Sequence, residues 1–266
     1  MNDRTTDSGL AAADELLQRE VRDGIARLTL NRPRQYNALS AQLLAALHDA
    51  LDALGRDEAV RVVMFTGSGP AFCAGHDLKE MRGLEPSGVE ELFTSCSAMM
   101  QKLVALPQPV IAVVNGLATA AGCQLVAQCD LAVASSDARF AVSGVNLGLF
   151  CSTPAVALSR NLGRKRSAEM LFTGEFIDAA RALEWGLVNR VAPPAQAMDT
   201  ALELAASLKA KPREALALGK ALFYRQLEEG LARAYADASR TISCNMDTDY
   251  AREGVDAFLQ KKRPPR

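Results

Sequence analysis

Two apolar segments that each lead through a loop of small residues into a helix constrain the fold most. Residues 61–66 (RVVMFT) and 110–116 (VIAVVNG) predict buried strands, because they are apolar almost throughout and end at glycine-containing turns. The first leads through residues 74–77 (AGHD) and the second through residues 119–122 (TAAG) into helical segments. Strands that alternate with helices predict an α/β fold with a mostly parallel sheet in its core.

The rest of the chain continues this alternation. Residues 21–33 predict a hairpin-like strand pair around Asp23-Gly24, and Ser40 is typical of a helix N-cap before a leucine-rich helix that ends near Gly55. Further helices are expected at 89–106, 154–163, 168–172 and 179–185, and strands at 131–135 and 187–191.

A change in pattern at Pro193-Pro194 suggests a domain boundary. Beyond this break the chain is helical in pattern to residue 260. We therefore expect a flexible N-terminal segment at residues 1–20, a core at residues 21–194 and a helical region at residues 195–266.

Composition excludes several classes of protein. Hydrophobic residues make up 49% and charged residues 23%, which is typical of a globular domain. The formal net charge of -1 gives no positive field for nucleic acid or an anionic membrane, and no apolar run reaches the roughly 20 residues of a membrane helix. Neither a GxGxxG after the first strand nor a P-loop is present, so a nucleotide-binding fold is not supported.

The cysteines and the N-terminus indicate the compartment. The six cysteines form no CxxC pair and no zinc-ligand spacing, so we expect reduced thiols and no metal site. Residues 1–20 contain acidic residues such as Asp3 and Asp14 and no apolar stretch, unlike a secretory signal or an acid-poor transit peptide. We therefore predict a cytoplasmic protein.

The two small-residue junctions are also the candidate active site. A chain that turns from a strand into a helix through small residues leaves backbone N–H groups approachable. Two such groups, one at each junction, can form an oxyanion hole that stabilises negative charge on a carbonyl oxygen. The same junctions are also compatible with tight turns that serve packing alone.

Signature segments along the chain resemble the enoyl-CoA hydratase/isomerase (crotonase) family. They are FCAGHDLKEM, PVIAVVNGLATAAGCQLVAQCDLAVAS and LFTGEFIDAARALEWGLVNRV, between an opening NRPRQYNAL and a closing REGVDAFLQKKRP. They span roughly residues 21–264 in collinear order. Within the family, GHDLKE, NGLATAAGCQLVA and GVNLGLFCSTP are most similar to the enoyl-CoA hydratase domain-containing protein three subgroup.

This resemblance implies a crotonase-like spiral of ββα repeats and a C-terminal helical trimerisation region, in a homotrimer or a dimer of trimers. It implies an acyl-CoA thioester as ligand, with coenzyme A as part of the substrate and no other cofactor, in acyl-CoA or fatty-acid metabolism. The family's oxyanion donors correspond to His76 and Ala121. Its other substrate contacts correspond to Arg34, Ala38, Ala74, Asp77, Leu78, Lys79 and Ser152.

The resemblance also places alanine where many relatives have glycine. Ala120 and Ala121 stand at these positions. We expect both to fit, because alanine permits helical dihedrals.

The two catalytic glutamates of the hydratases correspond to Gln124 and Gly144. A glutamine can bind a water molecule but cannot accept its proton, and glycine has no side chain. The His76 imidazole and the Cys151 thiol are candidate replacements, but the family uses the backbone of the former position, and an unactivated thiol such as that of Cys151 more often lines a pocket. An enoyl-CoA hydratase-like or isomerase-like enzyme and a non-catalytic acyl-CoA binder therefore both remain open.

Other functions have weaker support. Arg32, Arg34, Lys79 and Lys261 are candidates to meet the phosphates of coenzyme A, but residues 209–213 form too short a basic cluster for RNA binding. A serine hydrolase is also disfavoured, since the chain has no GxSxG.

Overall fold

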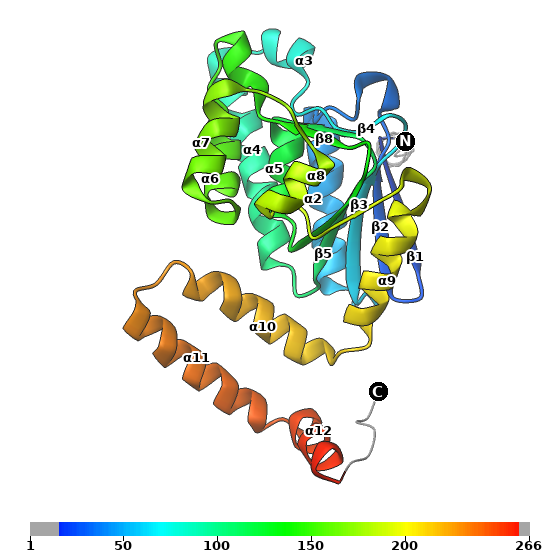
Figure 1. The fold of residues 1–266 in the computed structure, drawn as a ribbon, viewed down its shortest axis with the longest axis vertical. Helices are drawn as coiled ribbons and strands as arrows, with labels where there is room; N and C mark the ends of the chain where they lie inside the picture. Colours follow the sequence, from blue (N-terminus) through cyan, green and yellow to red (C-terminus); the bar gives the residue numbers. More distant parts are fainter. Residues whose placement is uncertain (1–15, 261–266) are drawn as a thin grey trace, which may run out of the picture.

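The larger of two sheets forms the centre of the molecule in the computed structural model, which describes residues 16–260 (Figure 1). Its neighbouring strands are parallel, except for an antiparallel hairpin of β1 and β2. The α/β class and the mostly parallel sheet are therefore confirmed. In spatial order its strands are β1 (Leu17–Arg22), β2 (Ile25–Leu30), β3 (Val62–Gly67), β5 (Val110–Val114), β7 (Leu131–Ser135) and β10 (Arg190–Ala192).

A second, smaller sheet follows the carboxyl ends of β3, β5 and β7. Its order is β4 (Ala71–Cys73), β6 (Leu117–Thr119), β8 (Arg139–Ala141) and β9 (Ile177–Asp178). Each central strand of the large sheet thus leads into a strand of the small sheet and then toward a helix. This is the expected spiral of ββα repeats. The small strands escaped sequence analysis, because two or three residues show no strand periodicity.

Seven helices of the described chain accompany these strands before the C-terminal region. The first begins at the predicted N-cap Ser40, whose side chain accepts a hydrogen bond from Leu43 N. The leucines of this helix are buried and fill the main core. The helices are α2 (Ala41–Arg56), α3 (Leu78–Arg82), α4 (Pro86–Ala105), α5 (Ala121–Gln128), α6 (Ser152–Asn161), α7 (Arg164–Thr173) and α8 (Ala179–Trp185).

The core of the structure extends beyond both predicted boundaries, residues 21 and 194. β1 begins at Leu17, inside the segment 1–20 that we expected to be flexible, since it pairs with β2 along its full length. Helix α9 (Ala197–Lys209) packs Ala201 and Ala205 against Val62 and neighbouring residues of the large sheet, so it belongs to the core although it follows residue 194. Residues 1–15 lie outside the described residues.

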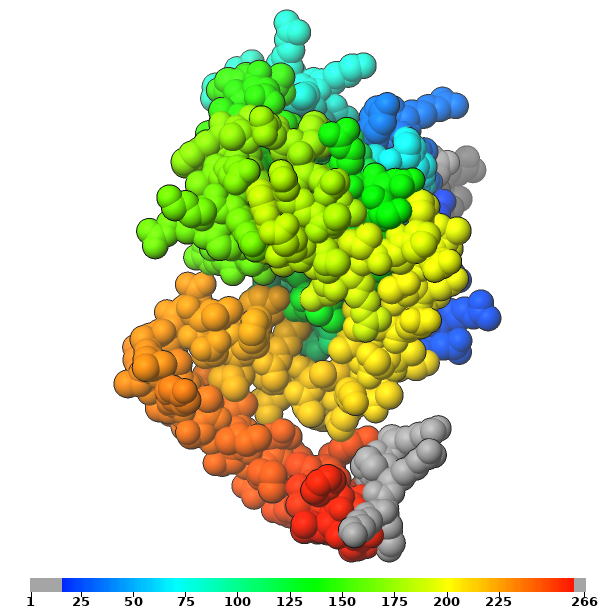
Figure 2. Space-filling model, in the orientation of Figure 1, coloured from blue at the N-terminus to red at the C-terminus, as the bar shows by residue number. Residues whose placement is uncertain are grey.

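The last three helices form an arm that extends from the core. These are α10 (Arg213–Gln226), α11 (Leu231–Met246) and α12 (Asp249–Leu259), drawn in orange and red in Figure 2. Figure 1 shows this arm at the end of the molecule opposite α3. Among residues 16–260, no helix combines the length and apolar character needed to cross a membrane.

A buried polar cluster fixes α10 to the core. Lys220 Nζ donates hydrogen bonds to Leu103 O (2.7 Å), Gln108 O (3.0 Å) and Asp130 Oδ2 (2.6 Å). Tyr224 OH donates to Asp130 Oδ1 (2.7 Å). Burial lowers the pKa of Lys220, and the ion pair with Asp130 opposes that shift.

Candidate active site

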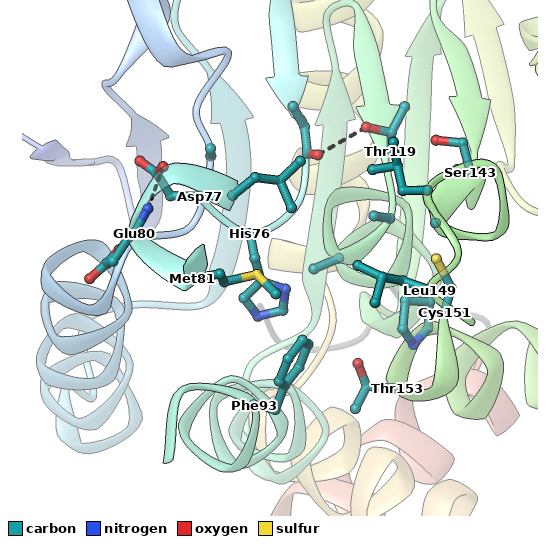
Figure 3. A pocket seen from close by; sticks show the side chains of 18 of the residues that line it. His76, Asp77, Glu80, Met81, Phe93, Thr119, Ser143, Leu149, Cys151 and Thr153 are labelled. Carbon is teal, nitrogen blue, oxygen red and sulfur yellow. Dashed lines mark hydrogen bonds between the residues drawn. The ribbon is translucent and has the colours of Figure 1, made fainter. Parts of the chain in front are cut away.

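The two small-residue junctions lie side by side, because β4 and β6 are parallel neighbours. Thr119 Oγ1 donates a 3.0 Å hydrogen bond to Ala74 O, which ties the two loops together (Figure 3). A Cβ on Gly122 would lie 1.9 Å from Cys73 O, so only glycine lets α5 begin this close to the end of β4. A Cβ on Gly75, which has a φ of +94°, would lie 3.3 Å from Ala121 N.

Backbone hydrogen bonds leave two amides of these junctions unpaired. Leu39 N donates to Gly75 O (2.7 Å) and Asp77 N donates to Leu39 O (3.0 Å). In such a parallel bridge the N–H of the intervening residue, His76, points away from the strand partner. Ala121 is the first residue of α5, where N–H groups lack intrahelical acceptors. Neither amide has an acceptor among residues 16–260.

Ala120 does not have the helical dihedrals that the sequence suggested for it. Its φ is 48° and its ψ is -119°, a region that favours glycine and costs an L-residue about 1–3 kcal/mol. Ala120 N donates to Ala141 O (2.9 Å), and Ala120 O accepts from Gln124 N (3.0 Å). These bonds hold the strained turn that places Ala121 at the start of the helix.

A cavity of about 920 Å³ lies beside the two amides. Its wall contains all but one of the predicted site residues: Arg34, Ala38, Ala74, His76, Asp77, Leu78, Lys79, Ala121, Gly144, Cys151 and Ser152. Sequence analysis missed others in the same wall, among them Met81, Phe93, Leu149 and Thr153. Phe93 lies four residues after Val89 on α4, a helical spacing that could have indicated a shared face, whereas Thr153 gave no signal.

Gln124 is the predicted site residue that does not line this cavity. Its side chain is buried in α5, with 4% exposure, and its Oε1 has no hydrogen-bond partner among the described residues. Gly144, the other position that the resemblance matches to a catalytic glutamate, does line the cavity.

Gly144 is packed tightly against the segment that follows it. A Cβ at this position would lie 2.7 Å from Leu149 O and 2.8 Å from Cys151 Sγ. The Cys151 thiol thus occupies space that a longer side chain at position 144 would need. Burial raises the pKa of Cys151, so its thiol is protonated at neutral pH.

The His76 ring lies inside the cavity, between Met81 and Phe93 in Figure 3. Its centroid is 4.6 Å from that of Phe93. Burial lowers the pKa of His76 to about 4, so the imidazole is neutral at physiological pH. Its Nε2 is buried and has no partner among residues 16–260.

Charged side chains gather near the start of α3. Asp77 caps this helix by accepting hydrogen bonds from Lys79 N (3.1 Å) and Glu80 N (3.3 Å), and it pairs with Arg32 at 2.9 Å. The Arg32 hydrogen bond holds the pKa of Asp77 below its usual range. Arg32 is therefore committed to Asp77, whereas the Arg34 and Lys79 side chains are exposed at the cavity. Lys261 lies outside the described residues.

A ββα spiral with two unpaired amides beside a cavity of about 920 Å³ defines an α/β fold with a candidate oxyanion hole. A family model described as enoyl-CoA hydratase/isomerase matches residues 20–265. The chain belongs to this family, which binds acyl-CoA thioesters, and the hydratase-like character expected from its sequence segments is confirmed at that level.

Individual relatives agree with this assignment and with the expected subgroup. The chain is 45% identical over 258 residues to the mitochondrial enoyl-CoA hydratase domain-containing protein 3 of Rattus norvegicus, covering 97% of this chain and 86% of the relative. A crystal structure of an enoyl-CoA hydratase from Mycobacterium smegmatis matches with a TM-score of 0.92 and 57% identity, covering 94% of this chain and 98% of that one. A crystal structure of the human enoyl-CoA hydratase domain-containing protein 3 matches with a TM-score of 0.89 and 42% identity, covering 94% of this chain and 100% of that one.

The comparisons contradict the cytoplasmic location predicted from the sequence. The rat relative and its counterparts from four further vertebrates are named as mitochondrial proteins. The prediction rested on the lack of a targeting pattern in residues 1–20, and such a lack does not decide a compartment.

Proposed function

We propose that this protein is an enzyme of acyl-CoA or fatty-acid metabolism in which the N–H groups of His76 and Ala121 hold the thioester oxygen of an acyl-CoA. The juxtaposition of these two unpaired amides beside a cavity of about 920 Å³ supports the proposal. Negative charge develops on this oxygen in hydration and in double-bond isomerisation alike. Preorganised donors are typically worth about 100-fold to 1,000-fold in rate each.

The charge distribution suggests how coenzyme A enters. Arg34 and Lys79 are exposed at the cavity, where they can meet the phosphates of the coenzyme. The part of the wall formed by Met81, Phe93 and Leu149 is apolar and suits the acyl chain. Coenzyme A as part of the substrate then provides the activated thioester, and we propose that no further cofactor takes part.

We assign proton transfer to Cys151. Hydration adds a hydroxyl group to the β-carbon and a proton to the α-carbon, so the enolate that forms needs a proton donor. Gln124 lies outside the cavity wall and Gly144 has no side chain, whereas the Cys151 thiol lines the cavity and is protonated at neutral pH. A neutral thiol can donate its proton to the α-carbon of the enolate, and the thiolate that remains then takes the proton released by the added water, which regenerates the thiol.

Turnover of a panel of enoyl-CoA thioesters by wild type, Cys151→Ala and Cys151→Ser tests this proposal. We expect wild-type turnover, a loss of at least about 100-fold in kcat for Cys151→Ala, and partial activity for Cys151→Ser. Cys244→Ala, which changes an exposed thiol on α11, is the matched control and should behave as wild type. Equal kcat values for all variants would rule out the role of Cys151.

A non-catalytic acyl-CoA binder is the alternative function, and the absence of both glutamates favours it. It predicts binding of acyl-CoA without product. Gln124→Glu combined with Gly144→Glu should then introduce hydration, but Leu149 O and Cys151 Sγ obstruct a side chain at position 144. Because Cys151→Ala removes only one of these two contacts, we expect the pair to act only in that background and only if the segment around Leu149 rearranges. Hydration of crotonyl-CoA by wild type at ordinary enzyme rates would exclude the alternative.

We further propose a homotrimer or a dimer of trimers as the assembly. One face of α11 exposes four large apolar side chains at helical spacing, and α12 exposes three more, a pattern typical of a covered interface. They are Leu231, Tyr235, Ile242, Met246, Val255, Phe258 and Leu259. Sedimentation analysis should give a trimer or hexamer for wild type and smaller species for Ile242→Glu, while a monomeric wild type would refute the assembly.

A further inference from the structure

Two buried polar atoms in the wall of the cavity beside the oxyanion hole, here called the acyl cavity, have no hydrogen-bond partner in the described part of the chain. They are Nε2 of His76 and Oγ1 of Thr153. Buried polar atoms in native proteins are nearly always hydrogen-bonded, so two exceptions in one wall call for an explanation. Both residues line the cavity although the two atoms themselves have almost no accessible surface, so a bound ligand becomes their partner once rotation of the side chains turns the atoms toward the cavity.

The Thr153 side chain lies away from the oxyanion hole, and so does the Phe93 ring against which the His76 imidazole packs. In Figure 3, Phe93 and Thr153 are at the side of the cavity opposite Thr119, which comes two residues before the oxyanion donor Ala121. Cys151 lies between these two levels in the same view. A thioester held by its carbonyl oxygen would therefore direct the distal carbons of its acyl chain, rather than its α- and β-carbons, toward His76 and Thr153.

The surroundings of the two atoms select a neutral partner. The charged side chains that line the cavity belong to residues 32–34 and 77–80, whereas Met81, Phe93 and Leu149 beside the two atoms carry no charge. The His76 imidazole is itself neutral, and a carboxylate placed there would lose its hydration without gaining a cation. A hydroxyl or keto oxygen, in contrast, can bond both a threonine hydroxyl and a neutral imidazole.

We propose that the acyl cavity recognises an acyl-CoA whose chain carries a neutral oxygen substituent beyond the β-carbon, held between His76 and Thr153. This inference rests on the proposed function, because it requires the thioester to bind in this cavity. Thr153 then determines specificity, and His76 acts twice: its backbone N–H holds the thioester oxygen and its ring holds the distal oxygen. A site built to bond a hydroxyl group discriminates strongly against an analogue that lacks it.

Equilibrium binding of saturated thioesters tests the inference, because saturated chains cannot be hydrated during the measurement. Hexanoyl-CoA is compared with hexanoyl-CoA bearing a hydroxyl on carbon 4, 5 or 6, and with the terminal carboxylate analogue adipoyl-CoA. We expect at least one hydroxylated ligand to bind wild type about tenfold or more tightly than hexanoyl-CoA. Adipoyl-CoA should bind no more tightly than hexanoyl-CoA.

Variants identify the groups responsible. Thr153→Val keeps the shape of the side chain and should bring the ratio of the affinities for the hydroxylated ligand and for hexanoyl-CoA close to one. Thr153→Ser keeps the hydroxyl group and should retain most of the preference for the hydroxylated ligand. His76→Phe retains the backbone donor and should reduce the ratio independently of Thr153. Ser159→Ala is the matched control, because Ser159 is an exposed hydroxyl on the same helix, α6, and does not line the cavity.

The outcomes separate the two proposals. If no thioester binds wild type, the proposed function itself fails. If hexanoyl-CoA binds and the best hydroxylated ligand has the same affinity, or if Thr153→Val leaves a preference unchanged, the inference about the distal oxygen is wrong while acyl-CoA binding stands.

Discussion

Cys151 Sγ fills the space in which a side chain at residue 144 would begin, since a Cβ on Gly144 would lie 2.8 Å from this sulfur atom. The same Cβ would lie 2.7 Å from Leu149 O, a backbone atom that cannot move aside easily. Packing thus closes residue 144, which the resemblance matches to a catalytic glutamate, to any larger side chain. A new catalytic side chain at residue 144 requires the neighbouring segment to rearrange.

This packing predicts coupled effects on stability. Gly144→Ala should destabilise the protein by about 1–3 kcal/mol through overpacking. In a Cys151→Ala background the same change should cost about 1 kcal/mol less, because one of the two close contacts is gone. A double-mutant cycle of urea denaturation measures this coupling, and strictly additive effects would contradict it. Gly219→Ala, at a helical site with open space around the added Cβ, should slightly stabilise the protein.

Strain at Ala120 predicts a stabilising glycine. Its φ of 48° and ψ of -119° cost about 1–3 kcal/mol, which exceeds the 0.5–1 kcal/mol or so of extra backbone entropy that glycine loses on folding. Ala120→Gly should therefore raise the free energy of unfolding by about 1 kcal/mol. Ala127→Gly, in the last turn of α5, is the control and should lower it by about 1 kcal/mol. Destabilisation by both changes would show that Ala120 is not strained.

The lowered pKa of His76 predicts a pH-dependent stability. Burial brings the pKa to about 4 in the folded protein, below the ordinary value of about 6.5 that applies to the unfolded chain. Between these values the unfolded chain binds a proton that the folded protein does not. The resulting contribution, at most about 3 kcal/mol, is complete above pH 6.5 and is lost as the pH falls to 4.

Denaturation of wild type and His76→Phe across this window isolates the effect. Carboxylates that titrate at low pH contribute to both proteins and cancel in the difference. The wild-type free energy of unfolding should fall more steeply than that of His76→Phe between pH 6.5 and 4. Parallel curves for the two proteins would mean that the folded protein protonates His76 as readily as the unfolded chain does.

Local sequence patterns predicted the large elements of the fold. Continuous apolar segments gave the central strands, leucine spacing and Ser40 gave α2, and the segment 179–185 matches α8 (Ala179–Trp185). The small sheet was missed, because its strands are formed by pairing between distant segments rather than by a local pattern. The resemblance to the family supplied the ββα repeat that the residues alone did not reveal.

The candidate site was predictable only where the backbone determines it. Small residues before two helices indicated unpaired amides at both junctions, and the resemblance to the family assigned them to His76 and Ala121. The contact between Gly144 and Cys151 depends on how a loop folds back, which no spacing reveals. Asn37 was missed as well, although its buried side chain bonds Ser68 O and Ala71 O and so holds the turn between β3 and β4.

The buried ion pair of Lys220 and Asp130 predicts how the C-terminal arm stays attached. Lys220→Met removes the cation and leaves the Asp130 carboxylate without a counter-charge. Breaking a buried ion pair in this way typically lowers the free energy of unfolding by about 3–5 kcal/mol. Tyr224→Phe removes a single hydrogen bond to this carboxylate and should cost about 1.5–3 kcal/mol. Hydrogen exchange should show faster exchange in α10 for Lys220→Met, and Asp130→Asn added to that variant should recover part of the lost stability.

Lys165→Met, on the exposed surface of α7, is the control and should change stability by less than about 0.5 kcal/mol. An equally small effect of Lys220→Met would mean that packing of α10, rather than this cluster, holds the arm to the core.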